Sequence, residues 1–152
     1  MIQFSLKGCN SGKPVYERIF ALDSNIISFY LKGNTGVIEN IEKAINEDHA
    51  IVIPPIVYYE VKRGLILIDA AKQMRKLETL CDLFPVGELG DYLLEKAITI
   101  YVQERKAKRN TEDADIFIAA FCIHHNYILV TDNIKHFQNI TDLHTVNWKS
   151  PS

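Results

Sequence analysis

Several patterns that mark large protein classes are missing from this sequence of 152 residues. Its three cysteines, Cys9, Cys81 and Cys122, are odd in number and widely spaced, so they give neither a disulfide framework nor a CxxC metal site. The five histidines follow no HExxH or zinc-finger spacing. A net charge of −2 excludes a protein that binds nucleic acid through its overall charge, so any such contact must come from a local patch.

Long apolar runs are also missing. None approaches the roughly 18–20 residues that a membrane helix needs, and the first residues, MIQFSLKGCNSGKP, lack the apolar core of a signal peptide. We therefore expect a cytoplasmic protein that contacts no membrane. The composition, 47% hydrophobic and 24% charged, is that of an ordinary globular protein, and the length suits one domain with a sizeable core.

Residues 1–17 are interpreted as a lead-in of uncertain structure, followed by a single domain over residues 18–148. One segment of the lead-in, GCNSGKP, superficially resembles a phosphate-binding loop. Gly8 and Gly12 stand one residue too close together for that motif, and Pro14 replaces its Ser or Thr. We interpret this similarity as coincidental.

Apolar runs of strand length alternate along the rest of the chain with segments of helical period. The expected strands are 18–23, 49–53, 81–88, 127–131 and 143–147, and the expected helices are 24–32, 35–48, 56–80, 90–110 and 111–126, with a helical turn at 132–137. Ser24 and Thr111 are expected to cap their helices, and Gly64 is a candidate break in the third helix. This alternation predicts an α/β fold, a three-layer sandwich in which helices cover both faces of a mainly parallel sheet of four to five strands.

Polar side chains follow three of the expected strands. Asp23 ends the first strand, and Asp132 and Asn133 come directly after the strand 127–131. Glu60 lies a few residues beyond the second strand, in the first turns of its helix. Because ligands of parallel α/β folds bind outside the carboxyl ends of the strands, the sequence predicts a site at this edge of the sheet.

Asp115 is the one polar residue in the apolar segment 114–123. A helix that is apolar all round is buried, and an isolated buried carboxylate needs a partner or a metal ion. Its helical neighbours Ile118, Ala119 and Cys122 cannot compensate it. With Asp23 and Glu60 it could form an all-oxygen cluster, which favours Mg²⁺ or Mn²⁺ and serves phosphoryl chemistry.

Two of the three acids also have a purely structural explanation, whereas Asp115 is harder to explain in that way. Asp23 could be a helix cap, and Glu60 could pair with Lys62 or Arg63 on the surface. The two acids of segment 112–113 are explained by the helix dipole, since they occupy a first turn. The histidines are interpreted as structural.

Four segments taken together resemble a known family: ALDSNIISFYLKG, IPPIVYYEVKRG, DADIFIAAFCIHHNYILVTDNIKHF and LHTVNW. In order and spacing they are similar to the PIN domain, and specifically to VapC-type toxins of toxin–antitoxin systems, over about residues 18–148. The resemblance implies an α/β sandwich and a ribonuclease that depends on Mg²⁺ or Mn²⁺. It also implies a cognate antitoxin protein that holds the enzyme inactive.

The resemblance also assigns roles by motif. It implies that the catalytic acids and metal ligands are Asp23, Glu60 and Asp115, with support from the polar residues Ser24, Asn25 and Thr131. One position departs from the pattern, because many members place a fourth acid where this chain has Asn133, although other members have Asn there. Asp132, one residue earlier, either replaces that acid as a metal ligand or points away, and the number of metal ions stays open.

Three functions follow from these residues. The first is a metal-dependent endoribonuclease whose RNA backbone contacts come from the basic segment ERKAKR, namely Arg105, Lys106, Lys108 and Arg109. These cations would equally suit a solvated helix end. The second is a haloacid-dehalogenase-like phosphatase with Asp23 as nucleophile, although Asn25 stands where such enzymes usually have a second Asp. The third is a non-catalytic module that binds nucleic acid or a protein partner.

A possible partner surface lies within residues 56–80. The run from Leu65 to Ile68 is too apolar to be fully solvated, and Lys72, Arg75 and Lys76 follow it. We expect one part of this run to pack in the core and the rest to line an antitoxin groove or a homodimer contact. An acidic antitoxin segment would complement the cations. The chain is expected to bind a cognate antitoxin and to form a homodimer.

Overall fold

The computed structural model describes residues 18–150, so the predicted lead-in and its phosphate-loop look-alike lie outside the described residues. A four-stranded sheet forms the centre of the fold, in the order β2-β1-β3-β4. Its strands are β1 (Ile19–Leu22), β2 (Ala50–Val52), β3 (Ile128–Val130) and β4 (Thr145–Val146). All three pairings are parallel, with Phe20 opposite both Ile51 and Ile128. The carboxyl ends of all four strands therefore meet at one edge, as predicted.

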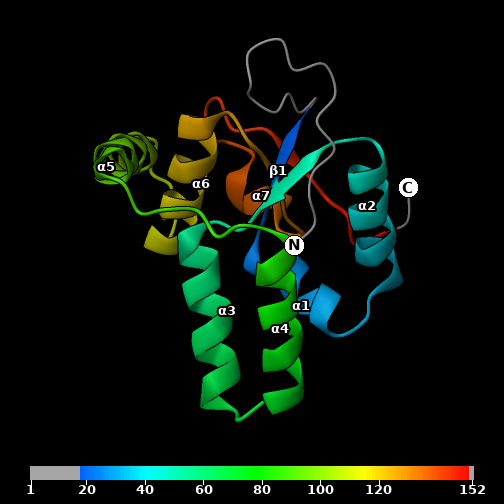
Figure 1. The fold of residues 1–152 in the computed structure, drawn as a ribbon. Helices are drawn as coiled ribbons and strands as arrows, with labels where there is room; N and C mark the ends of the chain where they lie inside the picture. The colour runs from blue at the N-terminus through cyan, green and yellow to red at the C-terminus, as the bar shows by residue number, and fades with distance from the viewer. Residues whose placement is uncertain (1–17, 151–152) are drawn as a thin grey trace.

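Helices lie on both sides of this sheet (Figure 1). They are α1 (Ser24–Leu31), α2 (Thr35–Asn46), α3 (Pro55–Leu67), α4 (Ala71–Leu83), α5 (Asp91–Lys106), α6 (Asp113–His125) and α7 (Ile134–Phe137). The antiparallel pair α3 and α4 projects away from the sheet, and α5 packs against α6 at the periphery. The predicted α/β sandwich is confirmed. Within residues 18–150, no helix is long and apolar enough to cross a bilayer.

The predicted strand at 81–88 is wrong. Helix α4 continues to Leu83, and only one isolated bridge, between Ile53 and Val86, extends the sheet in this region. Leu77, Leu80 and Phe84 are all buried and follow helical spacing, so the apolar run belongs to the inner face of α4. Pro85, which cannot donate an N–H, then ends the helix.

Segment 56–80 forms two helices, but the break is not at Gly64, which lies inside α3. The chain turns at Asp69, whose φ of 51° is in the left-handed region, and α4 begins two residues later. A short carboxylate side chain tolerates this conformation better than most residues do. The tight turn lets α3 and α4 run antiparallel.

Both predicted caps are also displaced. Asp23, not Ser24, is the N-cap of α1, because its side chain accepts a hydrogen bond from the Ser24 N–H. Thr111 does not cap α6; Glu112 occupies the N-cap position and makes no side-chain cap bond. The Thr111 hydroxyl instead donates to Glu104 Oε2 at 2.7 Å. The causes differ, since Asp23 itself takes the cap position directly before Ser24, whereas the Thr111 hydroxyl is engaged by Glu104.

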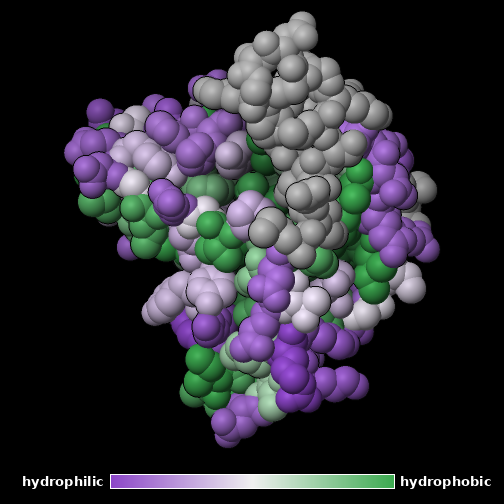
Figure 2. Space-filling model, in the orientation of Figure 1, coloured by the Kyte–Doolittle hydropathy of each residue, from purple (hydrophilic) through white to green (hydrophobic). Residues whose placement is uncertain are grey.

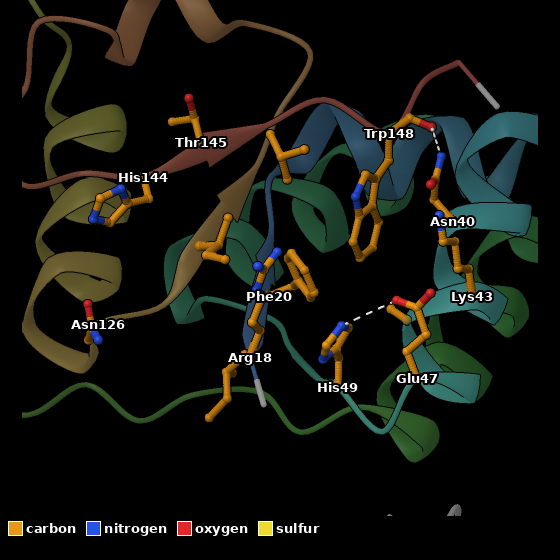
Figure 3. Close-up of a pocket in the computed structure, with 14 residues that line it drawn as sticks. Arg18, Phe20, Asn40, Lys43, Glu47, His49, Asn126, His144, Thr145 and Trp148 are labelled. Atoms are coloured by element: carbon orange, nitrogen blue, oxygen red, sulfur yellow. Dashed lines mark hydrogen bonds and ion pairs between the residues drawn. The ribbon is translucent and has the colours of Figure 1, made fainter. Parts of the chain in front are cut away.

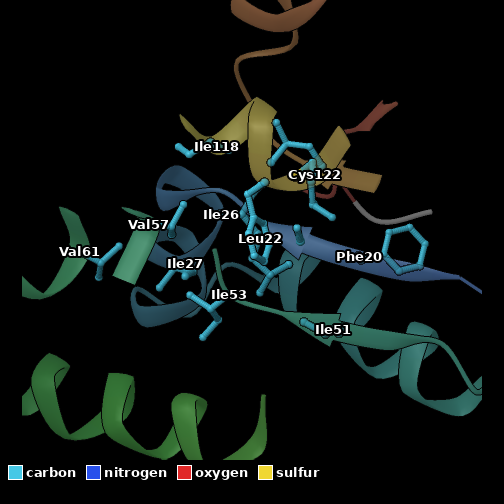
Figure 4. Close-up of a cluster of buried hydrophobic side chains, with 14 of the residues drawn as sticks. Phe20, Leu22, Ile26, Ile27, Ile51, Ile53, Val57, Val61, Ile118 and Cys122 are labelled. Atoms are coloured by element: carbon cyan, nitrogen blue, oxygen red, sulfur yellow. The ribbon is translucent and has the colours of Figure 1, made fainter. Parts of the chain in front are cut away.

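The hydrophobic core fixes the strand ends from which the polar residues emerge (Figure 4). Leu22 of β1 and Ile51 of β2 are fully buried, as are Ile26 and Ile27 of α1. Ile118 from α6 packs into the same cluster. Each fully buried aliphatic side chain stabilises the fold by about 1.5–3 kcal/mol. Asp23 directly follows this packed strand, so its backbone position is fixed.

Candidate active site

The adjacent ends of β1 and β3 form the floor of the candidate site. The Asp23 N–H donates to the Val130 carbonyl at 2.9 Å, which continues the parallel ladder past the end of β1. The next residue along β3 is Thr131, which is fully buried. Its hydroxyl donates to Asp23 Oδ2 at 2.7 Å. The strand pairing thus brings together two residues that are far apart in the sequence.

The Asp23 carboxylate is held on both oxygens and is only 3% exposed. Oδ1 accepts from the Ser24 N–H at 2.7 Å, and Oδ2 accepts from Thr131 and, at 3.3 Å, from the Asn25 amide. Burial raises the pKa of Asp23 above its ordinary value, against the lowering effect of the Thr131 hydrogen bond. Capping explains the Oδ1 contact alone. The tie to β3 shows that Asp23 is more than a cap.

Asn25 and Thr131 link the two strand ends through a small polar network. Asn25 Oδ1 accepts from the Asp132 N–H at 3.0 Å, while its amide also donates to Thr131 Oγ1 at 3.4 Å. Thr131 Oγ1 in turn accepts from the Asn133 N–H at 3.0 Å. These bonds orient Asp23 and set the path of the chain after β3. They give Asn25, Thr131 and the Asn133 backbone a supporting position.

Glu60 projects from α3 with one oxygen, Oε1, that is buried and has no hydrogen-bond partner among residues 18–150. Lys62 donates instead to the Tyr58 hydroxyl, and Arg63 stacks over the Tyr59 ring. Burial raises the pKa of Glu60, and the negative charge of Asp23 adds to this. The positive charge of Arg63 has the opposite effect and lowers the pKa of Glu60. A surface ion pair therefore does not explain this residue.

Asp115 lies in the first turn of α6, with 21% of its side chain exposed. The sequence predicted no compensating group, but His136 of α7 supplies one, since its Nδ1 lies 3.3 Å from Asp115 Oδ2. Burial raises the pKa of Asp115, and the charge of Asp23 raises it further, while the contact with His136 lowers it. The partner lies 21 residues away in the sequence and could not be inferred from the helix alone.

The three acids share one electrostatic environment. The charge of Asp23 raises the pKa of both Glu60 and Asp115, and Asp115 also raises the pKa of Glu60. Glu112, at the start of α6, raises the pKa of the same two residues. The fold therefore brings Asp23, Glu60 and Asp115 within electrostatic range of one another. It adds Glu112, which sequence reasoning had explained by the helix dipole alone.

The chemistry of these side chains suits a hard divalent cation, but their positions do not form a ready-made metal site. Among residues 18–150, no group of three or more His, Cys, Asp or Glu side chains stands close enough together to hold a metal ion. The donors are nonetheless all carboxylates, and their charges disfavour one another. Glu60 Oε1 has no hydrogen-bond partner in the described part of the chain. A cation such as Mg²⁺ or Mn²⁺ would relieve the repulsion and satisfy that oxygen.

Asp132 is directed elsewhere. Its Oδ1 accepts from the Asn147 amide at 2.9 Å, and its Oδ2 lies 3.4 Å from Lys149 Nζ. Asn133 is exposed at the N-cap position of α7. Of the two readings of Asp132 that the sequence left open, the geometry favours the one in which this side chain points away from the acids.

Two cavities flank the acids. One of about 330 Å³ is lined by Glu112 and Asp115 together with Lys135 and His136 of α7. The other, of about 410 Å³, is lined by Ser24 and Glu60 and extends along α3 as far as Ile68. Sequence reasoning missed Lys135 and His136. Their only local sign was the helical turn predicted directly after the Thr131 strand.

The predicted basic segment is only partly available to a ligand. Arg109 donates to both oxygens of the buried Glu104 at 2.7–3.1 Å, and Arg105 donates to the carbonyls of Arg109 and Thr111. Lys106 and Lys108 are exposed. Two of the four predicted RNA contacts therefore serve the loop between α5 and α6, and two face solvent.

A larger cavity, of about 630 Å³, lies at the opposite edge of the sheet, near the amino ends of β1 and β3 (Figure 3). Phe20 and Trp148 form its apolar wall, with their ring centroids 4.8 Å apart. His49 Nε2 lies 3.4 Å from Glu47, while its Nδ1 is buried without a hydrogen-bond partner among the described residues. None of the acids discussed above lines this cavity. It is therefore separate from the candidate site.

Comparison with known proteins gives consistent matches. The sequence model of the PIN domain matches residues 20–143. The ribonuclease VapC1 of Haemophilus influenzae strain R2866 is 30% identical over 136 residues, which cover 86% of this chain and 98% of that protein. The solved VapBC2 from Rickettsia felis, bound to a DNA fragment from its promoter, has a TM-score of 0.80 at 23% identity and covers 86% and 98% of the two chains. The VapBC-1 structure from nontypeable H. influenzae has a TM-score of 0.75 at 25% identity, covering 87% and 99%.

Proposed function

Because this chain belongs to the PIN-domain family, we propose that it is a VapC-type toxin, a metal-dependent endoribonuclease that hydrolyses RNA phosphodiester bonds and is neutralised by a cognate antitoxin. The observation that carries this proposal is the position of the buried Asp23 at the carboxyl end of β1, tied to Thr131 of the neighbouring strand end, with Glu60 and Asp115 near enough for its charge to raise the pKa of both. The ribonuclease activity of the H. influenzae relative and the VapBC complexes among the structural neighbours support it.

Asp23, Glu60 and Asp115 would hold Mg²⁺ or Mn²⁺ in this proposal. When bound, such an ion polarises the phosphate and activates a water molecule. The chain's own residues prepare the site for it. Thr131 and the Ser24 N–H keep Asp23 oriented, and His136 holds one oxygen of Asp115. Fixed orientation of ligands in this way supports both affinity and rate.

The RNA backbone would enter over the cavity beside Asp115. Lys135 lines that cavity, and Lys106 and Lys108 are exposed at the end of α5. These cations would contact phosphates, which position RNA without reading its sequence. Arg105 and Arg109 would act indirectly, by holding the loop that leads into α6.

The antitoxin would bind the projecting pair α3 and α4. Leu65 is buried, whereas Ile66, Leu67 and Ile68 are 60%, 84% and 67% exposed at the tip of α3, in the hydrophobic area at the bottom of Figure 2. The cavity lined by Glu60 runs to Ile68, so a segment that starts at the tip reaches the acids. We also infer a homodimer.

The phosphatase alternative fits the geometry poorly. The amide of Asn25 faces the carboxylate where such an enzyme would place a second acid. A non-catalytic module would have no use for the repulsion among three neighbouring carboxylates, one of them buried.

The test is RNA cleavage by the purified full chain over a titration of Mg²⁺ or Mn²⁺. We expect activity that rises with the metal and is lost with a chelator. Glu60→Gln should abolish it, because the amide removes the charge and keeps the shape. Glu95→Gln, an exposed acid on α5, is the matched control and should cleave as the wild type does. Undiminished cleavage in chelator would contradict the metal-dependent mechanism.

A further inference from the structure

An exposed tyrosine stands beside the acids on helix α3. Tyr59 directly precedes Glu60 and is 58% exposed. Arg63 comes four positions after Tyr59 and three positions after Glu60, so both residues are its neighbours on the helix surface. The guanidinium of Arg63 lies over the Tyr59 ring, 4.7 Å from its centroid. An aromatic ring and a positive charge therefore border the candidate active site on its α3 side.

The guanidinium of Arg63 is available to a ligand. Arg63 is exposed and makes no hydrogen bond or ion pair within residues 18–150, although its charge lowers the pKa of Glu60. The neighbouring cation differs, because Lys62 donates to the Tyr58 hydroxyl at 2.7 Å. Arg63 and Glu60 also line the same cavity of about 410 Å³. A ligand that lies over the acids on this side therefore meets Arg63.

A similar pair of side chains on α5 has a structural role instead. The guanidinium of Arg105 lies over the Tyr101 ring, 4.5 Å from its centroid, and also donates to two carbonyls of the loop before α6. Neither residue of that pair lines a cavity beside the acids. Tyr59 and Arg63 are therefore distinguished by their position next to Glu60, and not by the stacking alone.

We propose that Tyr59 and Arg63 form a subsite for one unpaired base of the RNA substrate, next to the phosphodiester that is cleaved. With Arg63 over one face of the Tyr59 ring, the base stacks on the other face. The planar guanidinium keeps its N–H edges for a phosphate of the same strand. A base in a single strand offers a flat face to an aromatic ring, whereas a base inside a duplex has both faces covered. The subsite therefore selects single-stranded RNA.

The charges around the acids favour a nucleic acid strand as the occupant. Carboxylates repel phosphates, so an RNA strand that crosses them needs cations nearby. Lys135 of α7 lines the cavity beside Asp115, and Arg63 lines the cavity beside Glu60. These two cavities flank the acids, so the strand meets a cation in each of them. Of these two cations, only Arg63 is stacked on an aromatic ring, which places the base contact on the α3 side.

The inference rests on the proposed ribonuclease function, and RNA binding tests it separately from cleavage. The probe is a labelled single-stranded RNA of mixed sequence, with a set of copies that each lack one base. The parent protein is the full chain with Asp115→Asn, in which we expect the RNA to stay intact. Tyr59→Ala in this parent should raise the dissociation constant for the intact RNA at least about fivefold. Tyr59→Phe keeps the ring and should bind as the parent does.

The RNAs that lack a base identify the stacking contact itself. One position should exist where loss of the base weakens binding by the parent. The same loss should have little further effect on Tyr59→Ala, because the two changes remove one shared contact and are therefore not additive. Arg63→Lys keeps the charge but loses the planar group, so it should weaken binding less than Arg63→Ala does.

Ile66→Ala is the matched control, since Ile66 is 60% exposed and lies seven positions after Tyr59 on the same face of α3. It should leave RNA binding unchanged and weaken antitoxin binding. If Tyr59→Ala binds the intact RNA as tightly as the parent, or if base loss weakens both proteins equally, the subsite is wrong. Tyr59→Ala that loses antitoxin affinity and keeps RNA affinity also overturns it.

Cleavage of the same RNA by the wild-type chain separates this inference from the proposed function. A wild-type chain that cleaves, with Tyr59→Ala alone equal to it in KM and kcat, overturns the subsite and leaves the ribonuclease in place. A wild-type chain that neither binds nor cleaves RNA overturns both. The expected result is a raised KM in Tyr59→Ala with a smaller change in kcat.

Discussion

Asp23 has two roles at the residue scale, as the N-cap of α1 and as the acid at the end of β1. The two roles use different oxygens, because Oδ1 accepts from the helix N–H and Oδ2 accepts from Thr131. Orientation of one carboxylate by two independent elements leaves it little freedom to rotate. The candidate metal ligand is thus fixed before any ion arrives.

Removal of the Thr131 hydroxyl tests this orientation. Thr131→Val keeps the shape of a buried side chain and removes the donor to Asp23 Oδ2, so we expect metal affinity or cleavage to fall roughly 10–100-fold. Thr131→Ser retains a hydroxyl and should recover most of the loss. Calorimetric titration with Mn²⁺, together with kcat and KM for RNA, checks both variants. Equal metal affinity and rate in Thr131→Val and the wild type would show that the hydroxyl plays no part.

Asp115→Asn should abolish cleavage and leave the fold intact. The substitution keeps the side-chain shape and removes the charge that would meet the metal. Asp113→Asn removes an exposed charge from the same helical turn and serves as the control, with activity close to that of the wild type. Cleavage assays and far-ultraviolet circular dichroism on both purified variants decide the matter. Full ribonuclease activity in Asp115→Asn would reject the proposed mechanism.

At the scale of elements, the loop between α5 and α6 is held by one buried carboxylate. Glu104 is 2% exposed and accepts from Arg109 and Thr111. The hydrogen bonds from Arg109 lower the pKa of Glu104, so this carboxylate is ionised at neutral pH. The chain leaves α5 near Lys108, whose φ is 59°, and returns to α6 over this contact. The position of Asp115 depends on that return.

Glu104→Gln should lower the free energy of unfolding by about 2 kcal/mol, because it removes a charge-assisted pairing from a buried position. The rate of RNA cleavage should fall as well, because the loop that leads into α6 is no longer held in place. Urea unfolding followed by circular dichroism gives the first quantity, with Glu95→Gln on the same helix as reference. A variant as stable as that reference would show that the pairing contributes nothing.

The surface predicted to bind the antitoxin lies on helices α3 and α4. Lys72, Arg75 and Lys76 lie along α4 and line a cavity of about 570 Å³ with residues of α1 and α2. Replacing all three with Glu should weaken antitoxin binding and reduce its dependence on salt, because an acidic segment would lose its complement. Titration of the purified antitoxin at several salt concentrations measures both effects.

The exposed pair Lys106 and Lys108 gives a reciprocal control. Their change to Glu should weaken RNA binding and leave antitoxin affinity as it was, since they lie at the end of α5. If the triple variant on α4 binds antitoxin with unchanged affinity and salt dependence, that surface is not the binding surface.

Local pattern explains which elements the sequence could predict. The four strands of the sheet were recoverable as short apolar runs, and α2 was recoverable because its apolar residues repeat with helical period. Segment 81–88 was misread because apolar residues such as Leu83 and Phe84 suit a buried strand as well as a buried helix face. Only the packing of α4 against the core decides in favour of the helix. The starts of α1 and α6 were misplaced by one or two residues because Asp23 caps α1 in place of Ser24, and because the Thr111 hydroxyl bonds Glu104 instead of the helix end.

The same distinction holds for the candidate site. Asp23, Glu60 and Asp115 could be proposed from the sequence because each follows a strand or interrupts an apolar helix. His136 and Glu112 could not, since their relation to Asp115 and Glu60 arises only when α7 and α3 pack near α6. Asp132 stayed open for the same reason, because its partners Asn147 and Lys149 lie beyond β4.

At the scale of the whole molecule, the free energy of unfolding of the metal-free protein depends on pH because three acids of the candidate site have raised pKa values. Burial raises the pKa of Asp23, Glu60 and Asp115, and the charge of Asp23 adds to the last two. The folded state therefore keeps these protons to higher pH than the unfolded chain does. Their stabilising contribution is present below the ordinary carboxyl pKa of about 4 and is lost as the pH rises through the raised values.

Asp115→Asn removes one of these groups, so in chelator it should become more stable than the wild type as the pH rises from 4.5 to 7.5. Glu104, whose lowered pKa acts with the opposite sign, is common to both proteins and cancels in the comparison. Urea unfolding at several pH values measures the difference. A difference that is constant over the whole range would contradict the linkage.

The bond between Thr131 and Asp23 joins residues that stand 108 positions apart. A growing polypeptide can pair β1 with β2 early, but it cannot orient Asp23 until β3 and Thr131 have left the ribosome. Asp115 also comes late in the chain. Nearly the whole protein must therefore be synthesised before an RNA-cutting centre exists, so a nascent or prematurely terminated toxin is harmless to the transcript that encodes it.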